Sequence, residues 1–153
     1  MDIELLDRVI VKAKAAAYVG GGEENRSSRA RSRDLAWREG EWRYLDSYFG
    51  GSDFIGQEII WRDDVPVWGM NYYGFILRPD LIDASRAGAT IKAALSALYE
   101  QGRFLGGFEW IGTHGTYIDE NSGDASRFRG REIIMVDGRQ VYALDYGGGL
   151  VRP

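Results

Sequence analysis

The sequence predicts an α+β protein built as a tandem duplication of an α-β-β-β-β unit. Residues 54–74 recur as residues 128–148, with nine of 21 aligned positions identical and no gap. Upstream, at an offset of 73, Asp46 matches Asp119. A helical pattern followed by glycines precedes each half, so we expect antiparallel sheets with one main helix in each repeat.

The predicted halves are residues 1–78 and 79–153, which together form one compact, pseudo-symmetric domain. The order of elements resembles one half of a cystatin-like fold, in which a helix packs across a curved antiparallel sheet. Two such units can pair their helix faces, extend one sheet, or stand side by side.

The first helix is predicted over residues 2–18, where apolar residues recur at helical spacing and Asp2 can cap the start. Gly20, Gly21 and Gly22 are expected to end it. The polar residues 23–34 contain four arginines and have no periodicity, so they are interpreted as a loop.

Strands are predicted in residues 35–49, around a turn at Glu39-Gly40, and in the hairpin over 54–74. Asp137-Gly138 is a strong hairpin signal at the second bend. A short helical turn over 80–86 and a helix over 90–101, ended by Gly102, complete the pattern. Alternation and helical spacing predict these buried residues: Ile60, Trp68, Tyr72, Leu95, Leu98, Ile134, Tyr142 and Tyr146.

Composition excludes several functions. The chain has 153 residues, a net charge of −4 and no cysteine, which removes disulfides, thiolate metal sites and thiol nucleophiles. The acidic balance gives no reason to bind nucleic acid. No apolar run is long enough to span a membrane and no signal peptide is recognisable, so a cytoplasmic protein without metal or cofactor is expected.

Residues 18–77 carry a motif that resembles an uncharacterised bacterial domain family of the DUF5680 type. Its parts here are Tyr18, glycines 20–22, Ser27-Ser28-Arg29, the run 44–51, and PVWGMNYYG at 66–74. The second half, at 128–149, looks like the family's C-terminal portion. Such domains often follow helix-turn-helix domains in bacterial regulators. The resemblance therefore implies a sensor or interaction module. This chain departs from that arrangement by beginning directly with the domain's own helix, which argues against a direct role in transcriptional regulation.

Glu58 and Glu132 occupy matching positions beside apolar residues, where desolvation would raise the pKa and suit a general acid. The alternative is a structural pair bonded to arginine or backbone amides, and repetition in both halves favours it. His114 is the only histidine and lies between glycines, a pattern typical of an exposed turn rather than a general base.

The sequence places a candidate ligand site where a basic loop, with Ser28, Arg29 and Arg31, meets surplus aromatic residues of the first half. Those aromatic residues are Trp37, Trp42 and Tyr73. The leading hypothesis is therefore a non-catalytic binding or sensor module for a small, anionic ligand or a protein partner. The alternative is a small hydrolase or lyase that uses Glu58 or Glu132 as acid or base.

Overall fold

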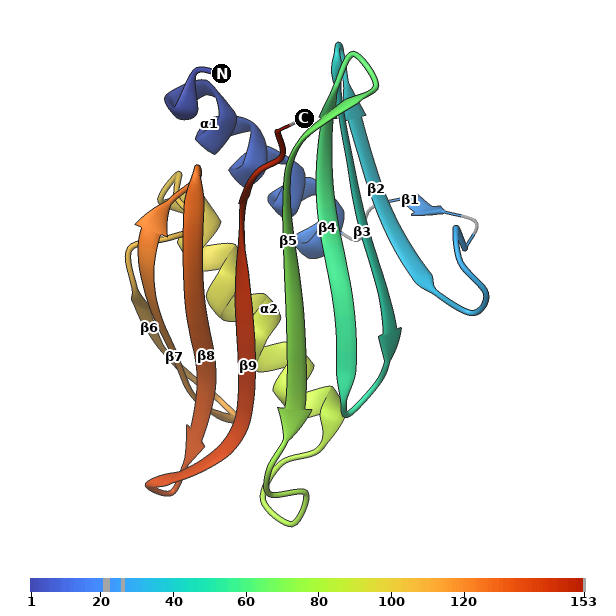
Figure 1. The fold of residues 1–153 in the computed structure, drawn as a ribbon. Coiled ribbons are helices and arrows are strands. Elements are labelled where there is room, and N and C mark those ends of the chain that lie inside the picture. Colours follow the sequence, from blue (N-terminus) through green and yellow to red (C-terminus); the bar gives the residue numbers. More distant parts are fainter. Residues whose placement is uncertain (21–22, 26, 153) are drawn as a thin grey trace.

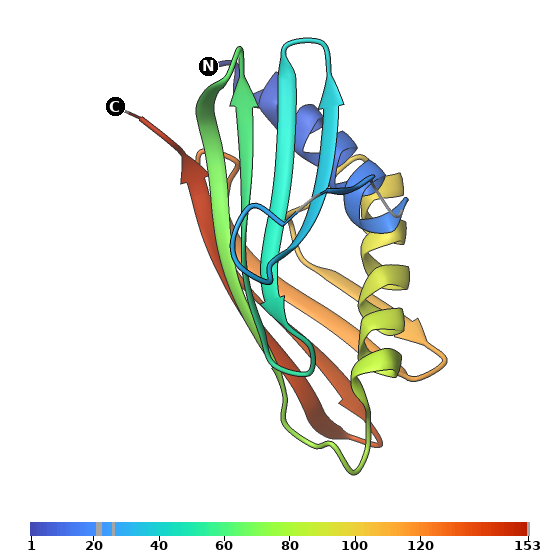
Figure 2. The ribbon, with the colours of Figure 1, turned by 90° about the vertical axis from the view of Figure 1, so that its right-hand side faces the viewer.

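The computed structural model describes residues 1–20, 23–25 and 27–152, and within them the strands form one antiparallel sheet (Figure 1). Nine strands follow the order β1-β2-β3-β4-β5-β9-β8-β7-β6. They are β1 Glu23–Asn25, β2 Arg33–Glu39, β3 Trp42–Gly50, β4 Phe54–Arg62, β5 Val65–Ile76, β6 Phe108–Gly112, β7 Gly115–Asp124, β8 Arg127–Val136 and β9 Arg139–Leu150. Both helices cover the same face of this sheet (Figure 2).

The helix α1, Ile3–Lys14, begins at Asp2, whose side chain accepts hydrogen bonds from the next turn's amides, as predicted. It continues without a break into a π-helical turn, η1 (Ala15–Val19), closed by the Gly20 N–H on the Ala15 carbonyl at 2.9 Å. Gly21 and Gly22, expected to end the helix, lie outside the described residues.

The second helix, α2 (Ala84–Glu100), is longer than predicted. It begins at Ala84, six residues before the expected start, and Asp83 caps it by accepting a hydrogen bond from the Arg86 amide at 2.8 Å. Gly88, in the helix interior, weakens the local propensity, and packing against the sheet outweighs that loss. Gly102 follows the helix with φ +73°, the conformation expected of a helix stop.

The predicted fold class is wrong in its organisation. The chain is α+β, but it does not form two repeats with a sheet and a helix each. Pairing of β5 with β9 joins all the strands into one sheet, and one N-terminal and one mid-chain helix share a face. Repetition within the sequence describes local patterns, whereas the β5–β9 pairing is a long-range contact that such patterns do not specify. The division at residue 78 stays a prediction.

The interpretation of residues 23–34 as a loop is also partly wrong. Glu23–Asn25 forms β1 and pairs with β2, which already begins at Arg33. Backbone pairing at a sheet edge does not require an apolar pattern, so the polar sequence concealed these strands. Arg26, one of the four arginines of this segment, lies outside the described residues.

The core lies between the sheet and the helices. Trp68 is fully buried, stacks on Phe128 at 5.7 Å, and donates its indole N–H to the Ala125 carbonyl at 3.0 Å. Burial is confirmed for Ile60, Ile134, Tyr142 and Leu98, whereas Tyr72, Tyr146 and Leu95 are half-buried. The half-buried residues border the cavity described next.

A candidate ligand-binding cavity

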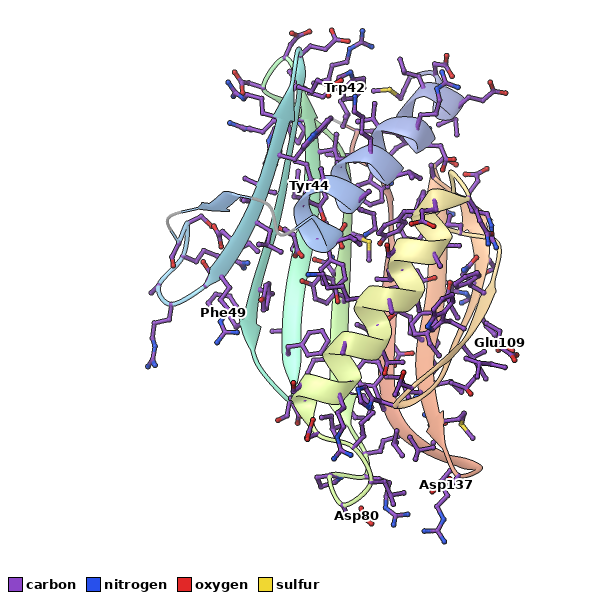
Figure 3. All side chains as sticks on the ribbon, turned by 180° about the vertical axis from the view of Figure 1, so that it is seen from behind. Trp42, Tyr44, Phe49, Asp80, Glu109 and Asp137 are labelled. Atoms are coloured by element: carbon purple, nitrogen blue, oxygen red, sulfur yellow. The ribbon has the colours of Figure 1, made fainter. Side chains whose placement is uncertain are left out.

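A cavity of about 490 Å³ lies between the sheet and the helices. Its lining comes from both helices, from η1, and from strands on both sides of the β5–β9 seam. Figure 3 views the molecule from the helix side, with α1 and α2 across the sheet and Tyr44, a lining residue on β3, labelled. Nine aromatic side chains line the cavity, among them Tyr18, Tyr99 and Phe104.

Four carboxyl groups line this apolar space: Asp46 on β3, Glu58 on β4, Asp119 on β7 and Glu132 on β8. Strand alternation places them there, because each shares a face with a fully buried residue two positions away: Tyr44, Ile60, Tyr117 and Ile134, respectively. Asp46 lies directly opposite Glu58, and Asp119 directly opposite Glu132. The sheet therefore presents two pairs of neighbouring acids to the cavity.

Each aspartate accepts a hydrogen bond from a tyrosine two strands away. Tyr72 on β5 donates to Asp46 at 2.6 Å, and Tyr146 on β9 donates to Asp119 at 2.8 Å. A glycine on the intervening strand makes this reach possible. A Cβ at Gly56 or at Gly130 would lie 2.2 Å from the tyrosine that crosses it.

Glu58 has a cationic partner. Lys14, the last residue of α1, donates its Nζ to the Glu58 carboxylate at 2.5 Å, and both side chains are buried. The same Nζ lies 3.6 Å from the Met70 sulfur. Because the pair is removed from water, its attraction is little screened, and loss of one member would leave a buried charge.

Among the residues that the structure describes, Glu132 has no ion pair and no partner within hydrogen-bonding distance; the Tyr117 hydroxyl on the neighbouring strand acts to lower the pKa of Glu132 but does not reach its carboxyl group. Burial, and then the neighbouring Asp119 charge, raise the pKa of Glu132 to about 8. Glu132 is half-buried, and as a lining residue it turns its remaining accessible surface toward the cavity. Two buried hydroxyls of the same part of the sheet, Tyr117 and Tyr142, also lack a partner.

The pKa of Asp46 is raised for the same two reasons. Burial, followed by the Glu58 charge, raises the pKa of Asp46 to about 7, although the Tyr72 hydrogen bond and Lys14 act in the opposite direction. Burial also raises the pKa of Asp119, against the hydrogen bonds from Tyr146 and Asn121. Near neutral pH, some of the carboxyl groups that line the cavity are therefore protonated.

Residues 46–151 match the family described as a domain of unknown function, DUF5680, which is more than half of the chain. The chain belongs to this family. Comparisons with curated proteins and with solved structures found no match. All four cavity carboxyls of this DUF5680 domain lie inside the matched region, whereas Lys14 precedes it.

The structure does not bring the six predicted site residues of the DUF5680 domain together. None of them lines the cavity. Arg29 is exposed, stacks on Phe49 at 4.7 Å and donates to the Ser47 hydroxyl at 2.8 Å. Ser28 donates its amide to Asp34 at 2.8 Å, and Arg31 is exposed with φ +66°.

The predicted aromatic residues point to different places. Trp37 and Trp42 pack into the core under α1, whereas Tyr73 is exposed. On β2 and β3, Trp37 lies opposite Tyr44 and Asp34 lies opposite Ser47. The second pair is three positions from the first along each strand. Odd spacing in a strand reverses the face, so the basic loop contacts the face opposite to that of the tryptophans.

Sequence reasoning singled out Glu58 and Glu132 but missed their surroundings. The available signal was the repetition itself, because Gly56, Tyr72 and Asp46 recur as Gly130, Tyr146 and Asp119. Lys14 left no such signal, since its partner lies 44 residues away. His114, expected in an exposed turn, is exposed between β6 and β7.

This DUF5680 domain can hold a compact apolar molecule against a small number of polar groups, the usual composition of a ligand site. Among the described residues, no three acidic or histidine side chains converge to hold a metal ion. No helix in the described part of the chain is both long and apolar enough to cross a membrane.

Proposed function

We propose that the protein is a non-catalytic binding module that takes a small, largely apolar ligand into the cavity. The observation that carries this proposal is the cavity itself, about 490 Å³ and walled by aromatic side chains. Volumes of roughly 300–1,000 Å³ are usual for small-molecule sites. We therefore locate the ligand site in the cavity and not at the basic loop, because Ser28 already donates a hydrogen bond to Asp34 and Arg29 to Ser47.

The test uses Gly88, which lines the cavity from α2. A Cβ at this position would meet no atom within 4 Å, so a side chain can be attached to this part of the cavity lining without a clash at its Cβ. Gly88→Leu should fill the cavity and stabilise α2 by about 0.5–1 kcal/mol, because glycine is a poor helix former. Loss of binding in this variant therefore cannot be attributed to unfolding.

The experiment is a thermal-shift screen of small amphiphilic compounds, followed by calorimetric titration of any compound that raises the melting temperature. Ligands should lose at least tenfold in affinity for Gly88→Leu. The control is Ala89→Leu, which places the same side chain one residue along on the exposed face of α2, outside the cavity lining. Ligands that bind both variants as well as the unmodified protein would place the site elsewhere.

A sensor role in a bacterial regulator, implied by the motif resemblance, is the finer form of this proposal. Lys14 at the end of α1 and Tyr18 in η1 both line the cavity, so a bound ligand would contact the N-terminal helix. Hydrogen exchange tests this role. The α1 amides should exchange more slowly with ligand, and unchanged exchange would argue for simple binding.

One observation favours the acid–base alternative. Glu132 faces the cavity without a partner and, with its pKa raised to about 8, is protonated at neutral pH, as a general acid must be. Glu58 is less suited, because Lys14 holds its carboxylate. A screen of esters, amides and glycosides would support the alternative only if turnover is lost in Glu132→Gln.

A further inference from the structure

More acidic than basic side chains line the cavity. Four of the six charged lining residues are acidic. The two basic ones are Lys14, which is buried, and Arg33, which is exposed on β2. Since Lys14 is bonded to Glu58 at 2.5 Å, no buried cation of the described chain is bonded to Asp119 or Glu132, although the charge of the half-buried Arg103 favours the ionised form of Asp119.

Glu132 is the carboxyl group that this imbalance leaves without a partner. Asp119 accepts from Tyr146 at 2.8 Å and from the Asn121 amide at 2.7 Å, and Asp46 accepts from Tyr72. Glu132 accepts no hydrogen bond in the described structure. Tyr142, also in the lining, has a buried hydroxyl without a partner, beside Gly74.

Aromatic rings line the same cavity as this carboxyl group. Tyr142 and Tyr146 line it from β9, next to the strand of Glu132, Phe54 lines it from β4, and Tyr18 and Tyr99 line it from the helix layer. The negative faces of aromatic rings attract cations, most strongly where water is excluded. An anion would be repelled by the same acids, and a bare metal ion would need more converging ligands than the described residues provide.

Resting on the proposed function, we propose that the cavity binds an organic cation, with an amine or quaternary ammonium head against Glu132 and its apolar body among the aromatic rings. The bound cation supplies to Glu132 the positive charge that Lys14 supplies to Glu58.

Binding of such a cation is linked to protons. The groups that influence Glu132 are Asp119 and Tyr117 on β7, Glu58 on β4 and Lys14 on α1, and the tyrosines facing it are Tyr18, Tyr99, Tyr142 and Tyr146. With the pKa of Glu132 at about 8, most molecules carry its proton at pH 7, and a cation must displace it. The affinity should therefore rise about tenfold from pH 7 to pH 9, as the ionised fraction grows.

The experiment compares three probes of one shape by isothermal titration calorimetry at pH 7 and pH 9. They are a phenylalkyl trimethylammonium ion, its neutral isostere with a tert-butyl group, and the corresponding sulfonate. At pH 9 the cation should bind at least tenfold more tightly than the neutral isostere, and the sulfonate should bind most weakly. Proton release at pH 7 should appear as a binding enthalpy that depends on the buffer.

Two variants assign the effect to one residue. Glu132→Gln should reduce the affinity of the cation to that of the neutral isostere and remove its pH dependence. Glu109→Gln, at an exposed position on the edge strand β6, should leave the cation's affinity unchanged. If the neutral probe binds but the cation gains nothing from its charge, the cation inference is overturned and the binding cavity stands. If none of the three probes binds, both proposals are overturned.

Discussion

The strands β3–β5 and the strands β7–β9 present two matching sets of side chains to the cavity, but the two sets differ in whether a cation is bonded to one of their acids. Asp46 and Glu58 face each other in one set, and Asp119 and Glu132 in the other. Lys14 completes the first set alone. The comparison shows that the sheet specifies where the acids lie, whereas the helix packed above decides whether they are neutralised.

The aspartates differ as well. Asp46 accepts one side-chain hydrogen bond, from Tyr72, whereas Asp119 accepts two, from Tyr146 and Asn121. The better-bonded aspartate is thus the neighbour of the unpaired Glu132. The set without a bonded cation has an additional neutral donor, Asn121, which stabilises the Asp119 carboxylate but does not reach Glu132.

The largest expected effect comes from removing the cation of the first set. Lys14→Met keeps the length of the side chain but leaves Glu58 buried without its partner, and should lower the free energy of unfolding by roughly 3–5 kcal/mol. Chemical denaturation at pH 8 measures it. The double variant Lys14→Met, Glu58→Gln should recover most of the loss.

The matched control for this prediction is Lys12→Met, on the same helix. Lys12 forms an ion pair with Glu39, but both side chains are more than half exposed. Exposed pairs contribute about 1 kcal/mol or less. Equal costs for the two lysines would show that burial of the Lys14–Glu58 pair does not matter.

The second prediction concerns pH and Glu132. Its pKa is about 8 in the folded protein against 4.5 without its surroundings, so between these values the folded state holds a proton that the unfolded state releases. Stability therefore falls as pH rises through this window. Glu132→Gln should match the unmodified protein near pH 5 and exceed it by on the order of 2–4 kcal/mol near pH 8.

Asp46 and Asp119, whose pKa values are also raised, add to the same decline and remain in the variant. The measurement is thus the difference between the variant and the unmodified protein across pH. A difference that is constant from pH 5 to pH 8 would contradict the raised pKa of Glu132. The same change at the exposed Glu109 should give no pH-dependent difference.

The third prediction tests what the two sets share. Gly56→Ala and Gly130→Ala each place a Cβ 2.2 Å from a tyrosine ring, so the ring must move away from its aspartate. Each should cost roughly 1–3 kcal/mol, the usual penalty of overpacking. Gly51→Ala, where a Cβ meets nothing within 4 Å, is the control and should cost little. A large loss of stability in only one of these two variants would show that the glycine and tyrosine do not have the same role in both sets of strands.

The smallest effect distinguishes the aspartates. Tyr72→Phe removes the one side-chain hydrogen bond that Asp46 accepts from the described residues, whereas Tyr146→Phe leaves Asp119 with Asn121. Because hydrogen bonds to charged groups contribute roughly 1.5–3 kcal/mol, the Tyr72 variant should be the less stable by about 1 kcal/mol at pH 8. Urea denaturation of both variants measures the difference, and the opposite order would show that Asn121 does not compensate.

Local features were the most predictable from the sequence. Asp2 as a helix cap, the turn at Asp137-Gly138 and the burial of Trp68 all depend on nearby residues or on alternation within one strand, and the structure confirms them. The start of α2 and the strand β1 were missed. Gly88 weakens the helical pattern, and β1 is held by backbone pairing that its polar side chains do not indicate.

The predicted ligand site shows why a cluster in sequence need not be a cluster in space. Arg29 and Trp37 are eight positions apart, yet Arg29 bonds to Ser47 and Trp37 packs under α1, on opposite faces of the sheet. A high density of charged residues along the chain does not indicate which face of the sheet their side chains occupy. The alternation of side chains along a strand does indicate it.

The sequence by itself determined which residues line up on the strands. The recurrence of Gly56, Glu58 and Tyr72 in the second half already contained the two sets of cavity groups, because strand alternation is a local property. Only the tertiary structure decided that β5 pairs with β9, that one cavity spans both sets, and that Lys14 reaches Glu58 and not Glu132. These features depend on contacts between segments far apart in the chain, whose geometry is set by the packing of whole elements.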